Sequence, residues 1–133
     1  IGSGAGLPGI VIALARPQLR VSLIEPLQRR VEFLHEAIDS LGLSNVDVIR
    51  AKSESIKGAY TYVVARAVAP LPRLIETTWH LVKPGGSLLA IKGASVEAEI
   101  AGLSLPKGAK LELKEINLDD LPPARVVAIS KAG

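Results

Sequence analysis

The spacing of apolar residues along the chain predicts where its helices lie. Between residues 27 and 41, apolar side chains recur every three or four positions, which indicates a helix with one apolar face. Gly42 follows as a residue suited to end that helix. Residues 7–15 are apolar almost throughout, which predicts a helix buried on every side. Shorter helices are expected at residues 71–81 and 96–103.

Runs of apolar and β-branched residues between these helices predict strands. Strands and helices alternate through most of the chain, an order typical of a parallel sheet with helices on both faces. The last two strands follow one another directly and predict a hairpin. We therefore predict a doubly wound α/β fold, with a mostly parallel sheet and an antiparallel edge strand, in one domain spanning residues 1–133. The predicted strands are residues 20–24, 46–49, 60–65, 87–91, 110–116 and 125–130.

Composition narrows the classes of function. The 133 residues are 48% hydrophobic and 22% charged, with a formal charge of +3, which permits a nucleic-acid partner. The absence of cysteine excludes disulfides, thiolate metal ligands and a cysteine nucleophile, and it fits a reducing cytoplasm. No apolar run reaches the roughly 18 residues of a membrane span. We expect neither a metal nor a membrane partner, and with so few aromatic residues an RNA would be held by Arg and Lys.

A glycine-rich turn opens the chain and fits two cofactor motifs. Gly2, Gly4 and Gly6 form the G-x-G-x-G pattern of class I methyltransferases. Gly4, Gly6 and Gly9 also satisfy the dinucleotide fingerprint G-x-G-x-x-G. In both motifs glycine lets the backbone approach a ligand at a helix N-terminus, and a purely structural turn is the alternative. Because a strand normally precedes such a turn and the chain begins at Ile1, we expect a fragment of a longer protein.

Glu25 favours a nucleoside cofactor. It lies nineteen positions after Gly6, at the end of the strand predicted at residues 20–24, where a carboxylate can accept hydrogen bonds from ribose hydroxyls. The alternative is a carboxylate that only stabilises the start of the next helix through the helix dipole. The turn and the acid together favour an adenosine cofactor, but they do not distinguish S-adenosylmethionine from NAD.

Arg66 and Lys92 each directly follow an apolar strand. In open α/β sheets, ligands bind along the edge formed by the carboxyl ends of the strands. Arg66 suits bidentate pairing with a cofactor carboxylate or an RNA phosphate, and Lys92 supplies a point charge. The alternative is that both side chains are merely solvated.

Four other titratable side chains are expected at the surface. His35 and His80 are poor candidates for a general base, because both lie on polar helix positions. Glu97 and Glu99 are interpreted as surface charge on the helix predicted at residues 96–103.

Longer motifs along the chain resemble one enzyme family. Residues 1–34 contain Gly-Ser-Gly-Ala-Gly-Leu-Pro-Gly-Ile and Leu-Ile-Glu-Pro-Leu-Gln-Arg-Arg-Val-Glu-Phe-Leu, and further motifs lie at residues 65–71, 83–86, 90–93 and 125–131. Together they resemble the RsmG (GidB) family of bacterial small-subunit ribosomal RNA methyltransferases. The resemblance implies a class I enzyme that transfers the methyl group of S-adenosylmethionine to N7 of guanine 527 in 16S rRNA. Guanine N7 carries a lone pair and no proton, so such an enzyme needs positioning rather than a general base.

The resemblance also implies roles for individual residues. Gly2 and Leu7 line the methionine end of the cofactor. Ser53 and Glu54 lie beside its adenine, and Arg66 closes the site. The implied cofactor-binding set is Gly2, Gly4, Gly6, Leu7, Glu25, Ser53, Glu54 and Arg66, with Arg66 and Lys92 as positioning residues and no catalytic base.

The chain departs from the family pattern at several places. It has Ala65 where serine is usual and Lys52 where arginine is usual. An acidic residue before the first glycine, an N-terminal helical segment and most of the first strand are expected to be missing. The implied partner is 16S rRNA or the small ribosomal subunit, and we expect a cytoplasmic monomer. An NAD-dependent oxidoreductase and a non-catalytic cofactor-binding module are the alternatives.

Overall fold

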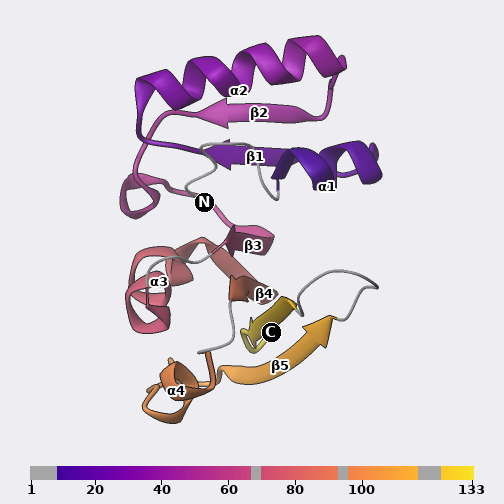
Figure 1. The fold of residues 1–133 in the computed structure, drawn as a ribbon. Coiled ribbons are helices and arrows are strands. Elements are labelled where there is room, and N and C mark those ends of the chain that lie inside the picture. The colour runs from indigo at the N-terminus through magenta and orange to yellow at the C-terminus, as the bar shows by residue number, and fades with distance from the viewer. Residues whose placement is uncertain (1–8, 67–69, 93–95, 117–123) are drawn as a thin grey trace. The chain divides into compact units, whose positions relative to one another are not determined.

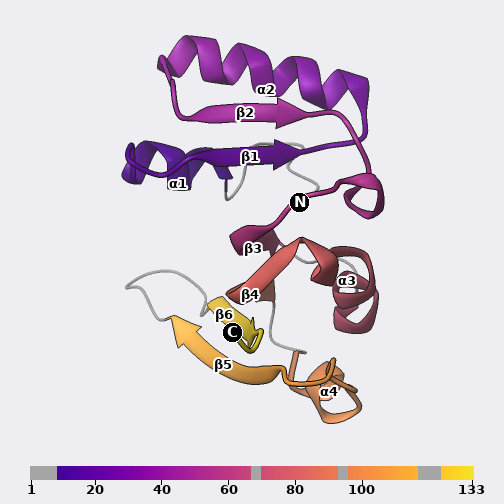
Figure 2. The same ribbon diagram turned by 180° about the vertical axis from the view of Figure 1, so that it is seen from behind.

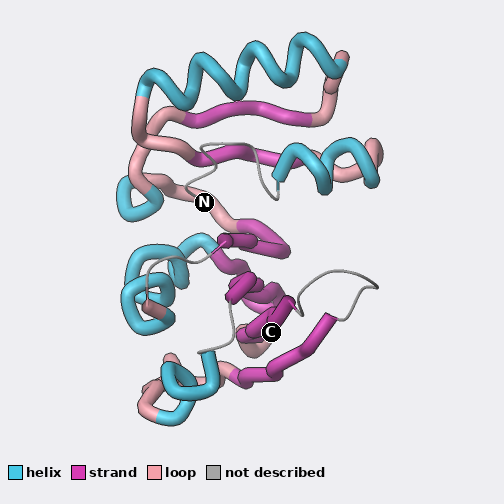
Figure 3. The backbone as a smooth tube through the Cα atoms, viewed as in Figure 1, coloured by secondary structure: helices cyan, strands magenta, loops and turns pink. Residues whose placement is uncertain are grey.

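The computed structural model describes residues 9–66, 70–92, 96–116 and 124–133. The chain divides into two compact units, Ile1–Ile56 and Lys57–Gly133, and each is described by itself. Both units alternate strands with helices, as the cyan and magenta segments of Figure 3 show. None of the helices in the described ranges has the length and apolar character needed to cross a bilayer.

The first unit is a pair of parallel strands covered by two helices. Strands β1 (Val21–Ile24) and β2 (Val46–Ile49) pair in parallel, with Val21 opposite Val46 and Ile24 opposite Ile49. Helix α2 (Gln28–Leu41) makes the crossover between them and runs alongside β2 in Figure 1, while α1 (Gly9–Ala15) precedes β1. The short 3₁₀ turn η1 (Ser53–Ser55) follows β2. The core of the unit is formed by Ile10, Leu23, Leu34 and Ile38.

Helix α2 confirms the central part of the predicted apolar face. Val31, Leu34 and Ile38 are buried, because they project from one side of the helix onto the strands, whereas Leu27 and Leu41 at the two ends are 52% and 49% exposed. Gly42 ends the helix with a left-handed φ of 64°, and its N–H donates to the carbonyl of Asp39. The N–H of the next residue donates to the carbonyl of Ile38, so the helix closes in the glycine-capped manner that the sequence predicts.

Helix α1 lies where the sequence predicts a helix, but its predicted burial on every side is wrong. Ile10 and Ala13 are buried, whereas Val11 and Leu14 are 52% and 48% exposed. The apolar composition does not distinguish a helix covered all round from one that packs on a small sheet through a single face. In this unit only one face of α1 is covered.

The second unit is a four-stranded sheet in the order β3-β4-β6-β5. Strand β3 (Tyr60–Arg66) is parallel to β4 (Val82–Lys92), and β6 (Ala124–Ser130) is antiparallel to both β4 and β5 (Lys110–Ile116). The predicted hairpin is therefore confirmed. The reversed strand β6 inserts between β4 and β5, so it lies one place in from the edge and β5 is the edge strand.

Two helices cover one side of this sheet. Helix α3 (Leu71–Thr78) continues into the 3₁₀ turn η2 (Trp79–Leu81), and α4 (Val96–Ala101) follows β4. Both helices lie on the same side of the strands in Figure 1 and in the reverse view of Figure 2. Right-handed crossovers that follow one another in the same direction across a sheet place their helices on one face, as in this unit. The predicted α/β class is confirmed in both units.

The motif Lys-Pro-Gly-Gly at residues 83–86 belongs to strand β4 rather than preceding it. Tyr60 pairs with Val82, but two residues later Tyr62 pairs with Ser87, so the motif forms an irregular bulge in the parallel ladder. Gly85 has a φ of 82°, which favours glycine. The strand predicted to begin at residue 87 starts five residues earlier because the chain resumes the same pairing after the bulge.

Replacing Gly86 with alanine should destabilise the second unit. A Cβ at this position would lie 2.5 Å from the backbone oxygen of Thr61, which cannot move without disturbing β3. Overpacking of this kind costs about 1–3 kcal/mol, measurable as a lower urea midpoint for Gly86→Ala. Gly102→Ala is the control, since no atom lies within 4 Å of the place that its methyl group would occupy. Equal midpoints for the two variants would contradict the close approach at Gly86.

Candidate functional site

Glu25 is a buried carboxylate at the end of β1. Its N–H donates to the carbonyl of Ile49 at 3.0 Å, which extends the ladder between β1 and β2 by one residue. The side chain is 1% exposed. Oε2 accepts a hydrogen bond of 3.0 Å from the N–H of Leu27 at the start of α2. Oε1 lies 3.9 Å from Nη1 of Arg30, a side chain that is itself 57% exposed.

The two oxygens of Glu25 are not equally satisfied. Among the described residues, Oε1 is the only buried side-chain polar atom without a hydrogen-bond partner. A buried carboxylate oxygen without a donor is costly, and such groups in native structures call for an explanation. Capping of α2 accounts for Oε2 alone. The geometry therefore leaves Oε1 available for a donor that is not part of the described chain.

Ser53 and Glu54 follow the neighbouring strand β2. Ser53 is 8% exposed, and its hydroxyl donates to Oε1 of Glu54 at 2.9 Å, while Glu54 itself is exposed. Since β1 and β2 are parallel and Ile24 is opposite Ile49, Glu25 and η1 both come after the carboxyl edge of this sheet. The structure thus brings the residues predicted for ribose and adenine to one edge of the first unit.

Arg66 and Lys92 lie at the carboxyl ends of the two parallel strands in the second unit. Arg66 is the last residue of β3 and is exposed, and it pairs with Ile91, the neighbour of Lys92 at the end of β4. Lys92 is different, because its side chain is only 6% exposed and its Nζ lies 3.0 Å from Oε1 of Glu99. Arg66 can therefore meet a ligand directly, whereas the ammonium of Lys92 is held by a carboxylate of α4.

The interpretation of Glu99 as surface charge is wrong. Its Oε1 accepts from Nζ of Lys92 and also from the N–H of Leu71, at 3.2 Å, in the first turn of α3. The helix period of α4 gives no hint of these partners, since they come from two other elements. A buried lysine at the end of a strand and the open N–H groups of a helix start are both positions where a carboxylate is favourable.

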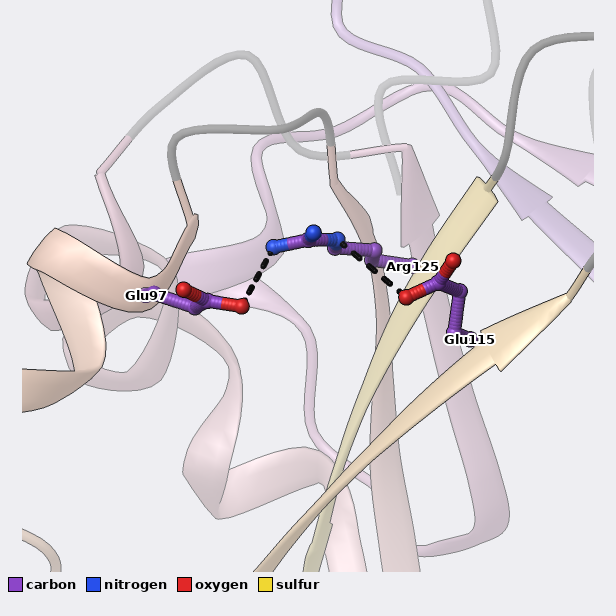
Figure 4. Close-up of polar contacts among 3 residues, drawn as sticks. All are labelled: Glu97, Glu115 and Arg125. Carbon is purple, nitrogen blue, oxygen red and sulfur yellow. Dashed lines mark hydrogen bonds and ion pairs between the residues drawn. The ribbon is translucent and has the colours of Figure 1, made fainter.

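Glu97 projects from the same helix to a different partner. Figure 4 shows the guanidinium of Arg125, at the start of β6, between Glu97 and Glu115. The distances are 2.7 Å from Nη1 to Glu97 and 3.9 Å from Nε to Glu115. Glu97 is 68% exposed, so its interpretation as surface charge holds, although it pairs with β6 rather than with its own helix.

The glycine loop lies mostly outside the described residues. Gly2, Gly4, Gly6 and Leu7 belong to that part, and their roles stay predictions. Gly9 is described, at the first position of α1, where a Cβ would overlap the side chain of Leu23 in β1. Close packing of helix against strand is the role that the last glycine of such a motif plays.

The two histidines lie at the surface, as the sequence predicts. His35 and His80 are both exposed. Within the described ranges, no three His, Cys, Asp or Glu side chains gather in a way that could hold a metal ion.

Comparison with known proteins places the chain in a family. Residues 1–116 match the family model GidB, described as rRNA small subunit methyltransferase G. The chain belongs to this family. The GidB match covers the first unit and the second unit through β5, so it includes Glu25, Ser53, Glu54, Arg66, Lys92 and Glu99.

A relative of known sequence agrees with the GidB assignment, and two solved structures have a similar fold. Ribosomal RNA small subunit methyltransferase G of Acidothermus cellulolyticus is 55% identical over 100 residues, covering 75% of this chain and 45% of that protein. The chain thus spans less than half the length of this relative. Among solved structures, TrmN from Thermus thermophilus has a TM-score of 0.72 at 20% identity, covering 97% of this chain and 42% of that one. MtNAS, solved as a mutant in complex with S-adenosylmethionine, has a TM-score of 0.69 at 17% identity, covering 99% and 53%.

The structural neighbours establish the fold. The GidB chain has the Rossmann-like α/β fold of class I methyltransferases with a mostly parallel sheet, as predicted. The reversed strand β6 beside β4 is part of this architecture.

Glu25→Gln should change the stability of the fold little. Glutamine keeps an oxygen for the N–H of Leu27 and removes a buried charge, but its amide nitrogen gains no acceptor and the ion pair with Arg30 is lost. Because these effects oppose one another, we expect a stability within about 1 kcal/mol of the original in urea unfolding. For comparison, Asn45→Ala removes an amide whose Nδ2 lies 2.8 Å from the carbonyl of Leu19 and 3.2 Å from that of Ala13, and it should lose about 1–2 kcal/mol. A larger loss for Glu25→Gln than for Asn45→Ala would show that the carboxylate is structural.

Proposed function

We propose that residues 1–133 form a methyltransferase domain that transfers the methyl group of S-adenosylmethionine to N7 of guanine 527 in 16S rRNA. Membership of the GidB family supports the reaction class and the ribosomal RNA substrate. The proposed partner is the small ribosomal subunit or its RNA, and the proposed state is a cytoplasmic monomer.

The observation that carries the cofactor proposal is the buried oxygen of Glu25 that accepts no hydrogen bond among the described residues. A ribose presents two neighbouring hydroxyls, and a carboxylate at the end of the second strand of a Rossmann-like fold can accept hydrogen bonds from them. Oε1 of Glu25 lacks such a donor among the described residues, and it is buried where the bond would be strong. Ser53 and Glu54, at the same edge, are proposed to lie beside the adenine.

The chemistry of the acceptor fits the residues at the edge of the second unit. S-adenosylmethionine, when bound, supplies a methyl group on a positively charged sulfur. Guanine N7 attacks through its own lone pair, so no side chain has to remove a proton. The proposed task of Arg66 is to hold a phosphate or the cofactor carboxylate through its planar guanidinium and so align the two reactants.

Cofactor binding tests the role of Glu25. In calorimetric titration, the protein should bind S-adenosylhomocysteine, and Glu25→Gln should bind it about 10–100-fold more weakly, because a hydrogen bond to a charged group is lost. Glu36→Gln, an exposed carboxylate on α2, is the control and should bind unchanged. Tight binding of NAD without binding of S-adenosylhomocysteine would instead support the oxidoreductase alternative.

Methyl transfer tests the role of Arg66. Transfer of labelled methyl groups from S-adenosylmethionine to unmethylated small ribosomal subunits should fall at least about 100-fold in Arg66→Ala, because alignment of the reactants is lost. Since Arg66 is exposed, the urea midpoint should correspond to a change below about 0.5 kcal/mol. Lys107→Ala removes an exposed charge from a turn in the same unit and should leave transfer unchanged. Full activity of Arg66→Ala would leave that residue without a part in the reaction.

A further inference from the structure

We infer that Glu99 is a positioning residue for methyl transfer, acting through Lys92 and through the first turn of α3. This inference rests on the proposed function. It concerns a side chain that binds two groups of the protein itself and that the sequence pattern assigns to the surface.

A single carboxylate oxygen of Glu99 serves two donors. Oε1 lies 3.0 Å from Nζ of Lys92 and 3.2 Å from the N–H of Leu71. The lysine side chain is 6% exposed and the glutamate side chain 25% exposed, so solvent screens this pair less than an ordinary surface pair. Hydrogen bonds that join opposite charges are shorter and stronger than neutral ones. Glu99 therefore fixes the ammonium of Lys92 in place.

The two donors lie at the ends of elements that border the carboxyl edge of the second unit. Lys92 ends β4, and Leu71 begins α3. The parallel pairing of β3 and β4 places Arg66, the last residue of β3, opposite Ile91, the neighbour of Lys92. By holding the ammonium of Lys92, Glu99 fixes a second cation next to Arg66 at this edge.

Helix α4 has little else to hold it in place. It spans six residues, and Val96 is its one buried residue. Lys92 of β4 and Arg125 of β6 are opposite one another in the sheet. Glu99 of α4 contacts the first of these residues, and Glu97 contacts the second. Glu97 bonds to Arg125 at a more exposed place, where an ion pair contributes less. The two glutamates on one helix therefore provide a matched comparison of a positioning pair and a surface pair.

The test compares Glu99→Ala with Glu97→Ala in the full protein. With saturating cofactor and small ribosomal subunits, Glu99→Ala should lower kcat about tenfold or more, since a misplaced contact residue costs alignment. The Kd for S-adenosylhomocysteine and the KM for subunits should change less than about threefold.

A second measurement follows the amide proton of Leu71. Its exchange with solvent, followed by NMR, should become about tenfold faster in Glu99→Ala because its acceptor is gone. Glu97→Ala should change kcat and Leu71 exchange less than about twofold, and Glu99→Gln, which restores an acceptor, should recover part of both losses.

Three results would count against the inference. An unchanged kcat in Glu99→Ala would show that the contacts of Glu99 are structural only. Equal losses in the two alanine variants would assign the effect to α4 as a whole rather than to Glu99. If the unaltered protein methylates no ribosomal RNA, the proposed function fails. In that case the exchange rate of the Leu71 amide proton tests Glu99. An unchanged rate in Glu99→Ala would show that Glu99 does not hold the start of α3.

Discussion

Parallel pairing of strands is the constraint on which both units of this chain depend. It forces each connection to cross over through a helix, and it brings the carboxyl ends of neighbouring strands to one edge. In the first unit this edge carries Glu25 and the turn at Ser53, and in the second it carries Arg66 and Lys92. Apolar side chains of the strands pack against the helices, and the polar side chains proposed to contact ligands stand where the strands end.

Charged groups placed at such an edge need partners, and the chain meets this need in two ways. Lys92 is buried and paired within the protein, through Glu99. Glu25 is buried more completely, but one of its oxygens is left without a donor among the described residues. A buried oxygen without a hydrogen bond costs free energy, and this supports the proposal that Glu25 binds the cofactor, whereas Lys92 is already held in place by the protein.

Much of this arrangement could be predicted from the sequence, because it follows from local patterns. The central apolar face of α2, its glycine cap and the bounds of β2 depend on a few neighbouring residues, and the structure confirms them. The position of Glu25 at a strand end follows in the same way. The partial exposure of α1 and the contacts of Glu99 could not be predicted, since both depend on which elements meet in space. The insertion of β6 between β4 and β5 is likewise a property of topology, which the hairpin pattern alone does not determine.

Mass mapping of 16S rRNA from a strain that lacks the gene tests the central claim most directly. We predict that one 7-methylguanine, at guanine 527, is lost, and that it returns when the unaltered gene is supplied. Complementation with a gene encoding Arg66→Ala should leave the base unmethylated. An rRNA with every methyl group in place in the deletion strain would contradict the proposed methyl transfer and favour a cofactor-binding protein without catalytic activity.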